Sequence, residues 1–313
     1  MKILLPDTMP LAPALPDGVT PVTYDVTSPV PPEHRDAEVL VMWGNSADAL
    51  ADAARTLPDL RLVQSLAAGP DQILAAGFAP EVAVSSGAGL HDRTVTEHAL
   101  LLTLALLRRM PQMLRSQAAH VWDRELGGLQ PLRPEGAVTS LIGAEVLVWG
   151  FGNIGQNLAP LLTGLGANVR GVARSAGRRS GYDVIAESDL DAELSGTDVL
   201  IMILPATPAT AKALGADRLA LLPEHAYVVN VGRGATVDED ALLGALTSGA
   251  IAGAALDVTA VEPLPAESPL WDAPDIIISP HGAGGRPVGA DELIAANVAA
   301  LVEGRELRNL VER

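Results

Sequence analysis

One strand–turn–helix unit in the middle of the chain constrains its fold more than any other feature. The apolar run AEVLVW leads into GFGNIG, in which Gly150, Gly152 and Gly155 have the spacing G-x-G-x-x-G, and the amphipathic run QNLAPLL follows. In this setting the first glycine permits a tight turn, the second lets a pyrophosphate approach the backbone, and the third lets helix and strand pack closely. The N–H groups at the helix start, from Asn153 and Ile154 onward, can then bind phosphates. The unit therefore predicts a dinucleotide-binding domain.

Strand-like and helical segments alternate on both sides of this unit. Before it, β-like runs lie at 2–5, 38–43, 60–66 and 81–86. After residue 143 the alternation is longer and more regular, with runs such as DVLIMIL, AYVVNV and DIIIS. Such alternation predicts parallel sheets with helices on their faces. We expect one helix over 94–118, interrupted near Pro111, to carry the chain across a domain boundary, and a last helix over 287–304 to return to the first half.

Composition excludes several classes of partner. At 313 residues the chain is long enough for two domains, and its apolar content of 48% supplies material for two buried cores. The net charge of −17 argues against the broad basic surface that nucleic acid or an anionic membrane would require. With no cysteine there is no disulfide and no thiolate site, and we expect no bound metal. We find no membrane span and no signal peptide, and therefore expect a cytoplasmic protein.

The end of the second strand after the glycine turn indicates which dinucleotide is bound. An NAD site usually places an acidic residue there, which binds the ribose 2′-hydroxyl. Here the strand ends in Ala173-Arg174-Ser175, and Arg178 and Arg179 follow. Guanidinium groups at this position suit a 2′-phosphate. We therefore predict NADP, with NAD as the alternative; a second interpretation is that these arginines only occupy a solvated loop.

Three later segments mean little singly but are specific together. They are VVNVGRGATVDEDAL at 228–242, AGAALDVTAVEP at 252–263 and IISPHGAGG at 277–285, and each includes the end of a predicted strand. Open α/β sheets build their sites at these carboxyl ends. Together with QSLAAGPDQIL at 64–74, VTEHALLLTLALLRR at 95–109 and GFGNIG, they resemble the D-isomer-specific 2-hydroxyacid dehydrogenase family over essentially the whole chain from about residue 60.

This resemblance implies an oxidoreductase that transfers a hydride between a nicotinamide and a small 2-keto or 2-hydroxy acid. By motif it assigns Arg233 to substrate binding, His281 to acid/base catalysis and Glu262 to the role of the histidine's partner. These residue types suit the chemistry, because reducing a keto group requires a proton donor and a fixed positive charge near its oxygen. An ionised carboxylate beside a histidine favours the protonated ring and fixes its orientation.

The resemblance also implies how the two ligands are held. The backbone of Ala67, Ala68 and Gly69 would receive the substrate carboxylate, while Asp257 and the loop around Thr207 would contact the nicotinamide end of the cofactor. The cofactor-binding residues expected in all are Gly150, Gly152, Asn153, Ile154, Gly155, Arg174, Ser175, Pro205, Thr207, Val231 and Asp257.

An architecture follows from the same resemblance. A Rossmann cofactor domain at 93–282 would be inserted into a flavodoxin-like substrate domain made of 1–92 and 283–313, so that the α/β chain forms two doubly wound parallel-sheet domains. The family is commonly dimeric, which implies a homodimer. His91 and His98, near the first boundary, are interpreted as packing or capping residues.

Alternatives for the substrate stay open. The strand end Met42-Trp43-Gly44-Asn45 offers no phosphate clamp, which favours glyoxylate or hydroxypyruvate over phosphoglycerate. Glu262 argues against the family's formate dehydrogenases, which have glutamine as the histidine's partner. The family's phosphite enzymes keep the arginine, glutamate and histidine and are a further alternative. So is an NAD(H)-sensing binding protein that resembles the family's transcriptional corepressors.

Overall fold

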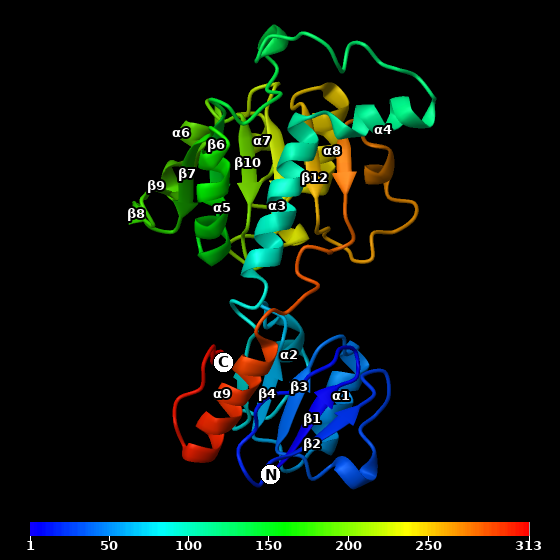
Figure 1. The fold of residues 1–313 in the computed structure, drawn as a ribbon, viewed down its shortest axis with the longest axis vertical. Coiled ribbons are helices and arrows are strands. Elements are labelled where there is room, and N and C mark those ends of the chain that lie inside the picture. Colours follow the sequence, from blue (N-terminus) through cyan, green and yellow to red (C-terminus); the bar gives the residue numbers. More distant parts are fainter. Residues whose placement is uncertain (313) are drawn as a thin grey trace. The chain divides into compact units, whose positions relative to one another are not determined.

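The computed structural model describes residues 1–312, and the chain forms two compact units. Unit 1 comprises Met1–His91 and Arg286–Arg313, and unit 2 comprises Asp92–Gly285. Each unit is one twisted sheet with helices on both faces (Figure 1). The chain thus belongs to the predicted α/β class.

Unit 1 contains a five-stranded parallel sheet in the order β2-β1-β3-β4-β5. This is the predicted flavodoxin-like order, in which the strand order reverses beside the first strand. Its strands are β1 (Lys2–Pro6), β2 (Thr20–Tyr24), β3 (Val39–Met42), β4 (Leu62–Ser65) and β5 (Ala83–Ser85). Its helices are α1 (Ala47–Thr56), α2 (Asp71–Ala75) and α9 (Ala290–Glu303).

The central strands of unit 1 are apolar on both faces because each face is covered by a helix. Successive side chains of a strand point to opposite sides of the sheet. In β3, Leu40 packs with the cluster that includes Leu50 of α1, whereas Val41 packs with the cluster that includes Ile294 and Val298 of α9. Continuous apolar runs such as VLVM therefore form buried parallel strands.

Unit 2 contains an eight-stranded sheet in the order β13-β12-β11-β10-β6-β7-β9-β8. All neighbouring pairs are parallel except β8 with β9, and the order from β9 to β12 is that of a Rossmann fold. The strands are β6 (Glu145–Trp149), β7 (Asn168–Ala173), β8 (Gly177–Arg179), β9 (Tyr182–Ala186), β10 (Val199–Met202), β11 (Tyr227–Asn230), β12 (Gly253–Leu256) and β13 (Ile276–Ile278).

Helices cover both faces of the unit 2 sheet, as Figure 1 shows. The helices are α3 (Asp92–Leu107), α4 (Met110–Ala118), α5 (Asn153–Gly164), α6 (Leu190–Leu194), α7 (Ala216–Leu219) and α8 (Glu239–Ser248). Leu102 of α3 and Leu158 of α5 pack into one core cluster, while Leu194 of α6, Leu219 of α7 and Leu242 of α8 pack into the other. The sheet is therefore buried on both sides.

The helical stretch expected over 94–118, with an interruption near Pro111, is divided into two helices. α3 ends at Leu107, Arg109 adopts a left-handed conformation with φ 54°, and α4 begins at Met110. Pro111 lies in the first turn of α4, where its missing N–H leaves no helical hydrogen bond unmade.

Three short strands were not predicted from the sequence. β2 is an edge strand that contains Pro21, while β8 and β9 form a hairpin whose first strand reads GRR. Proline is tolerated only at sheet edges and polar runs lack hydrophobic alternation, so neither pattern indicates a strand by itself. Within residues 1–312, no helix is long and apolar enough to cross a membrane.

Candidate active site

The three segments singled out in the second half of the chain leave the same edge of the unit 2 sheet. In the parallel register Asn230 at the end of β11 lies opposite Leu256 at the end of β12, and Leu256 lies opposite Ile278 at the end of β13. The residues that follow these three strands therefore gather at one carboxyl edge, where open α/β sheets bind ligands.

His281 and Glu262 are in direct contact. The Nδ1 atom of His281 lies 2.7 Å from Oε2 of Glu262. Both side chains are partly open to solvent, with exposed fractions of 46% and 38%. An ionised carboxylate only accepts hydrogen bonds, so Nδ1 carries a proton and donates it to Glu262. The other ring nitrogen, Nε2, is then the atom that can exchange a proton with a ligand.

Glu262 is held by its own loop. Its Oε1 accepts a hydrogen bond from the backbone N–H of Thr259 at 3.0 Å, and the N–H of Ala260 donates to Oε1 of Glu239 at 2.6 Å. A Cβ atom at Gly234 would overlap with the carbonyl of Thr259, so only glycine permits the loop after β11 to approach this loop so closely. The close approach brings the segment that carries Arg233 against the loop that carries Glu262.

Arg233 is fixed mainly through its backbone. Its carbonyl accepts hydrogen bonds from Nδ2 of Asn230 at 3.1 Å and from Oγ1 of Thr236 at 2.6 Å, while its guanidinium Nη1 donates to the carbonyl of Gly232 at 2.8 Å. The side chain is half-buried. Arg233 therefore presents a permanent positive charge from a rigid segment at the same sheet edge as His281.

Asp257 is almost wholly buried and anchors the loop that carries His281. Its carboxylate accepts hydrogen bonds from Oγ of Ser279 at 2.6 Å and from the N–H groups of Gly282 and Ala283 at 2.8 and 3.1 Å. The Asp257 carbonyl also accepts from the N–H of His281 at 2.8 Å. Both carboxylate oxygens thus have donors within the protein, which makes Asp257 a support of the histidine loop besides its predicted contact with the cofactor.

The sequence analysis did not identify the remaining members of this network. Nε2 of His98, on α3, lies 2.8 Å from Oγ of Ser279 and 3.2 Å from Oδ1 of Asp257. Since Ser279 donates its only proton to Asp257, and the Asp257 carboxylate only accepts, His98 is the donor to this pair. No local signal marks this role, because His98 is 181 residues away from Ser279 in the sequence.

The glycine turn has the shape that a dinucleotide phosphate requires. Gly150 has φ 102°, and a Cβ there would lie 2.5 Å from the carbonyl oxygen of Ile203. Gly152 is the N-cap of α5 and offers no side chain to the first-turn N–H groups, whereas a Cβ on Gly152 would meet nothing within 4 Å. The N–H groups of Asn153 and Ile154 at this helix end therefore suit an anionic group.

The arginines after β7 are arranged by the β8–β9 hairpin. Arg179 donates from Nη2 to the carbonyl and the hydroxyl of Ser175 at 3.1 and 3.2 Å, and Nη1 lies 3.5 Å from the carbonyl of Phe151 in the glycine turn. Arg178 donates to the carbonyl of Gly181. Arg174 is exposed, and across residues 1–312 no hydrogen bond or ion pair engages its side chain. These cationic groups fit a 2′-phosphate.

The other predicted cofactor residues lie at neighbouring strand ends of unit 2. In the turn after β10, Oγ1 of Thr210 donates to the carbonyl of Pro205 at 2.6 Å and accepts from the N–H of Thr207 at 2.9 Å. Val231 follows β11 and is buried, and its N–H donates to the carbonyl of Met202 at 3.1 Å. The turn and Val231 thus belong to the same carboxyl edge as the glycine turn.

The predicted substrate loop belongs to unit 1. Ala67, Ala68 and Gly69 follow β4, and the N–H of Ala67 donates to Oγ of Ser65 at 3.0 Å. In the described part of the chain, no hydrogen bond uses the N–H of Ala68 or of Gly69. Two backbone donors of this loop are therefore free to bind a carboxylate.

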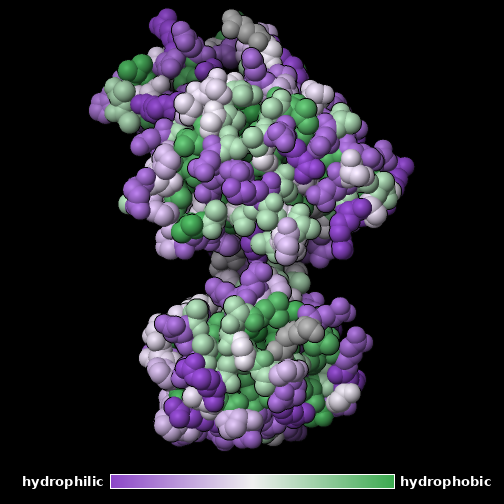
Figure 2. All heavy atoms as spheres, turned by 180° about the vertical axis from the view of Figure 1, so that it is seen from behind, coloured by the Kyte–Doolittle hydropathy of each residue, from purple (hydrophilic) through white to green (hydrophobic). Residues whose placement is uncertain are grey.

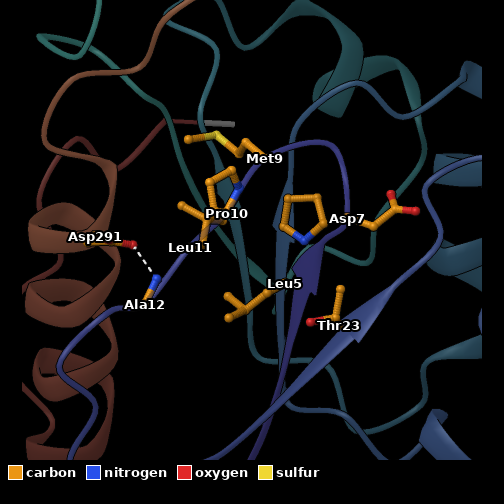
Figure 3. Close-up of a pocket in the computed structure, with 9 residues that line it drawn as sticks. Leu5, Asp7, Met9, Pro10, Leu11, Ala12, Thr23 and Asp291 are labelled. Atoms are coloured by element: carbon orange, nitrogen blue, oxygen red, sulfur yellow. Dashed lines mark hydrogen bonds between the residues drawn. The ribbon is translucent and has the colours of Figure 1, made fainter.

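Unit 1 also has a cavity of about 380 Å³, which Figure 3 shows in close-up. None of the predicted site residues lines it. Asp7 and Asp291 contribute carboxylates, and Asp291 accepts a hydrogen bond from the N–H of Ala12 at 3.0 Å. Two negative charges disfavour an anionic acid, so this cavity is not the substrate site. Among the residues that the structure describes, no group of His, Asp and Glu could hold a metal ion.

Comparison with known proteins identifies the family to which the chain is similar. The family model for the D-isomer specific 2-hydroxyacid dehydrogenase NAD binding domain matches residues 100–283. The glyoxylate/hydroxypyruvate reductase A of Serratia proteamaculans (strain 568) is 34% identical over 291 residues, which cover 90% of this chain and 88% of that protein.

Solved structures agree in fold along nearly the whole chain. A D-isomer specific 2-hydroxyacid dehydrogenase family protein from Aeromonas salmonicida superposes with a TM-score of 0.84 at 27% identity and covers 99% of this chain and 98% of that one. The NADPH-dependent glyoxylate/hydroxypyruvate reductase from Sinorhizobium meliloti, solved with NADP and sulfate, has a TM-score of 0.81 at 26% identity and covers the same shares of both chains.

Proposed function

The chain belongs to the D-isomer-specific 2-hydroxyacid dehydrogenase family, and from that premise we propose that it is an NADP-dependent reductase of small 2-keto acids such as glyoxylate and hydroxypyruvate. NAD(P)-dependent reduction of a 2-keto acid, or oxidation of the matching 2-hydroxy acid, follows from the family itself. The observation that carries the proposal is the contact of 2.7 Å between His281 Nδ1 and Glu262 Oε2.

His281 is the proton donor in this proposal. With Nδ1–H bonded to Glu262, a protonated ring presents Nε2–H to the substrate. A dinucleotide bound at the glycine turn would supply a hydride for the keto carbon. His281 gives its Nε2 proton to the keto oxygen. The ring is left neutral, with its Nδ1–H still bonded to Glu262, and takes up a proton before the next cycle. Glu262 holds the orientation of the ring through this hydrogen bond.

Arg233 and the unit 1 loop bind the acid. The Arg233 guanidinium supplies a fixed positive charge with a fork geometry that matches carboxylate and keto oxygens. The N–H groups of Ala68 and Gly69 supply two neutral donors for the carboxylate. The loop donors would hold the carboxylate, and the Arg233 charge would stabilise the negative charge that develops on the keto oxygen.

The residues after β7 favour NADP as the cofactor. Arg174, Ser175 and Arg179 place hydroxyl and guanidinium groups where an NAD enzyme would have a carboxylate. The related enzyme from Sinorhizobium meliloti is NADPH-dependent and was solved with NADP. Both lines favour NADP, with NAD as the weaker cofactor.

The substrate class follows from the small number of cationic groups near the loop. No arginine or lysine occurs between Met42 and Asn45 or between Gln64 and Gly69. A phosphorylated acid would need such a clamp. The named relative is a glyoxylate/hydroxypyruvate reductase, which agrees with an acid of small, uncharged side chain.

The test is a rate measurement with a panel of acids. We expect NADPH oxidation, followed at 340 nm, to be faster with glyoxylate and hydroxypyruvate than with pyruvate, phenylpyruvate or 3-phosphohydroxypyruvate. His281→Ala should lower kcat by about 10²- to 10⁴-fold, since it removes the acid/base group. Turnover confined to the phosphorylated acid, or NADP reduction with phosphite as the only activity, would contradict the proposed substrate class. An unchanged kcat in the variant would contradict the role of His281.

A homodimer also stays a prediction. Figure 2 shows hydrophobic side chains on the projecting part of unit 2 that carries α4. In that part of the chain, exposed apolar residues include Leu114, Val121, Trp122 and Leu129. Exposed apolar groups of this kind are typical of an interface between subunits, and a second copy of the chain would cover them.

A further inference from the structure

His91, the last residue of the first segment of unit 1, supports the loop that is proposed to bind the substrate carboxylate. The residue is 5% exposed. Its Nε2 atom lies 2.7 Å from the carbonyl oxygen of Leu66, which directly precedes Ala67. A carbonyl oxygen only accepts hydrogen bonds, so Nε2 carries the proton and donates it.

The opposite side of this peptide and the two neighbouring peptides are also held. The N–H of Ala67 donates to Oγ of Ser65 at 3.0 Å. In the neighbouring peptides, the N–H of Leu66 donates to the carbonyl of Met42 at 3.0 Å, and the carbonyl of Ala67 accepts from the N–H of Gly87 at 2.7 Å. A Cβ atom on Gly87 would overlap with the Leu66 carbonyl, so the chain at Gly87 packs directly against this peptide. The direction of the Leu66–Ala67 peptide, and hence of the two N–H groups that follow, is therefore set by neighbours on several sides.

The His91 ring is itself fixed by Trp43. The two rings are stacked, with centroids 5.4 Å apart and an interplanar angle of 21°. The Trp43 backbone is held at both ends: its N–H donates to Oδ1 of Asn45 at 3.2 Å, and its carbonyl accepts from Oγ1 of Thr8 at 2.8 Å. The Asn45 amide in turn donates to the hydroxyl of Tyr24 at 2.9 Å.

We infer that His91 is a positioning residue for substrate: it holds the carbonyl of Leu66, so that the N–H groups of Ala68 and Gly69 point toward the acid, and the Trp43 indole keeps its ring in place. This inference rests on the proposed role of the loop in binding the carboxylate. The loop would bind the carboxylate equally in the ground state and the transition state. A displaced loop therefore raises KM for the acid and leaves kcat nearly unchanged.

Two substitutions at His91 separate the hydrogen bond from the packing. His91→Phe keeps a ring against Trp43 but removes the donor to Leu66, whereas His91→Gln keeps an amide donor and loses the stack. We expect His91→Phe to raise KM for the keto acid about tenfold, with kcat and KM for NADPH within about twofold of the wild type. His91→Gln should restore most of the affinity for the acid. Trp43→Phe, which keeps an aromatic ring beside His91, should have a smaller effect than His91→Phe.

Hydrogen exchange of the backbone amides gives a readout that needs no substrate. Peptides that cover 66–70 should exchange faster in His91→Phe than in the wild type and in His91→Gln, while peptides that cover β6 in unit 2 should not change. If both His91 variants lose affinity for acid and NADPH alike, and exchange rises throughout unit 1, the residue is only structural and the inference fails. If the wild type turns over no keto acid, the proposed function fails, and the exchange result alone then decides whether His91 holds the loop.

Discussion

Replacing Arg174 with alanine should change which cofactor the enzyme uses without changing its chemistry. Arg174 directly follows β7, its side chain is exposed, and no hydrogen bond or ion pair within residues 1–312 engages its guanidinium. Arg179, in contrast, already donates to the carbonyl and hydroxyl of Ser175. Arg174 is therefore the arginine here that can turn fully toward a 2′-phosphate, and NADH lacks the group that it would bind.

The size of the effect follows from the kind of contact that is lost. A hydrogen bond to a charged group contributes about 1.5–3 kcal/mol, and solvent screening at an exposed site favours the lower part of that range. A loss of about 1.5–2 kcal/mol corresponds to a fall of about 10- to 30-fold in kcat/KM for NADPH. The value for NADH should stay within about twofold, since neither its ground state nor its transition state uses the 2′-phosphate.

Initial rates at 340 nm with either cofactor and saturating keto acid measure both values. Arg55→Ala is a matched control, because Arg55 is an exposed arginine of α1 in unit 1 whose ion pair with Asp52 is 3.4 Å long. It removes the same charge and should leave both cofactor constants unchanged. Equal losses for NADPH and NADH in Arg174→Ala, or a wild-type preference for NADH, would refute the reasoning from the strand end.

Two further predictions concern stability. Asn297→Ala removes the buried amide that donates to Oε1 of Gln64 at 2.6 Å and to Oγ of Ser85 at 2.9 Å. The substitution should lower the free energy of unfolding of unit 1 by about 2–4 kcal/mol. Urea unfolding followed by hydrogen exchange measures this change, and a loss below about 0.5 kcal/mol would contradict the expected contribution of the network. Burial raises the pKa of Asp198, but the Arg133 guanidinium, the backbone N–H of Glu145 and His225 outweigh burial and hold that pKa below its usual value. The contribution of ionised Asp198 to stability should therefore be complete above about pH 5 and be lost below about pH 4. The difference in Tm between the wild type and Asp198→Asn should become smaller on acidification. A difference that does not depend on pH would show that ionisation of Asp198 contributes nothing.

The features that the sequence determined by itself are those whose cause is local. Strand, glycine turn and helix adjoin at 145–164, so GFGNIG indicated the Rossmann unit without knowledge of its neighbours. Parallel strands share one carboxyl edge, which is why Arg233 and His281 could be expected at the same edge from their position after predicted strands. The break between α3 and α4 was expected near Pro111, and it occurs at Arg109, because a proline is accommodated in the first turn of the next helix.

Only the tertiary structure decided which distant side chains meet. His98 contacts Ser279, which donates to Asp257, and these contacts support the loop that carries His281. The sequence around His98 on α3 gives no local sign of them. His91 likewise reads as an ordinary residue of a loop until its ring is found between Trp43 and the carbonyl of Leu66. Periodicity and turn chemistry describe neighbours along the chain, whereas such contacts arise only when separate strands and helices pack. The sequence could therefore predict the residues proposed for the chemistry, but not those that hold them in place.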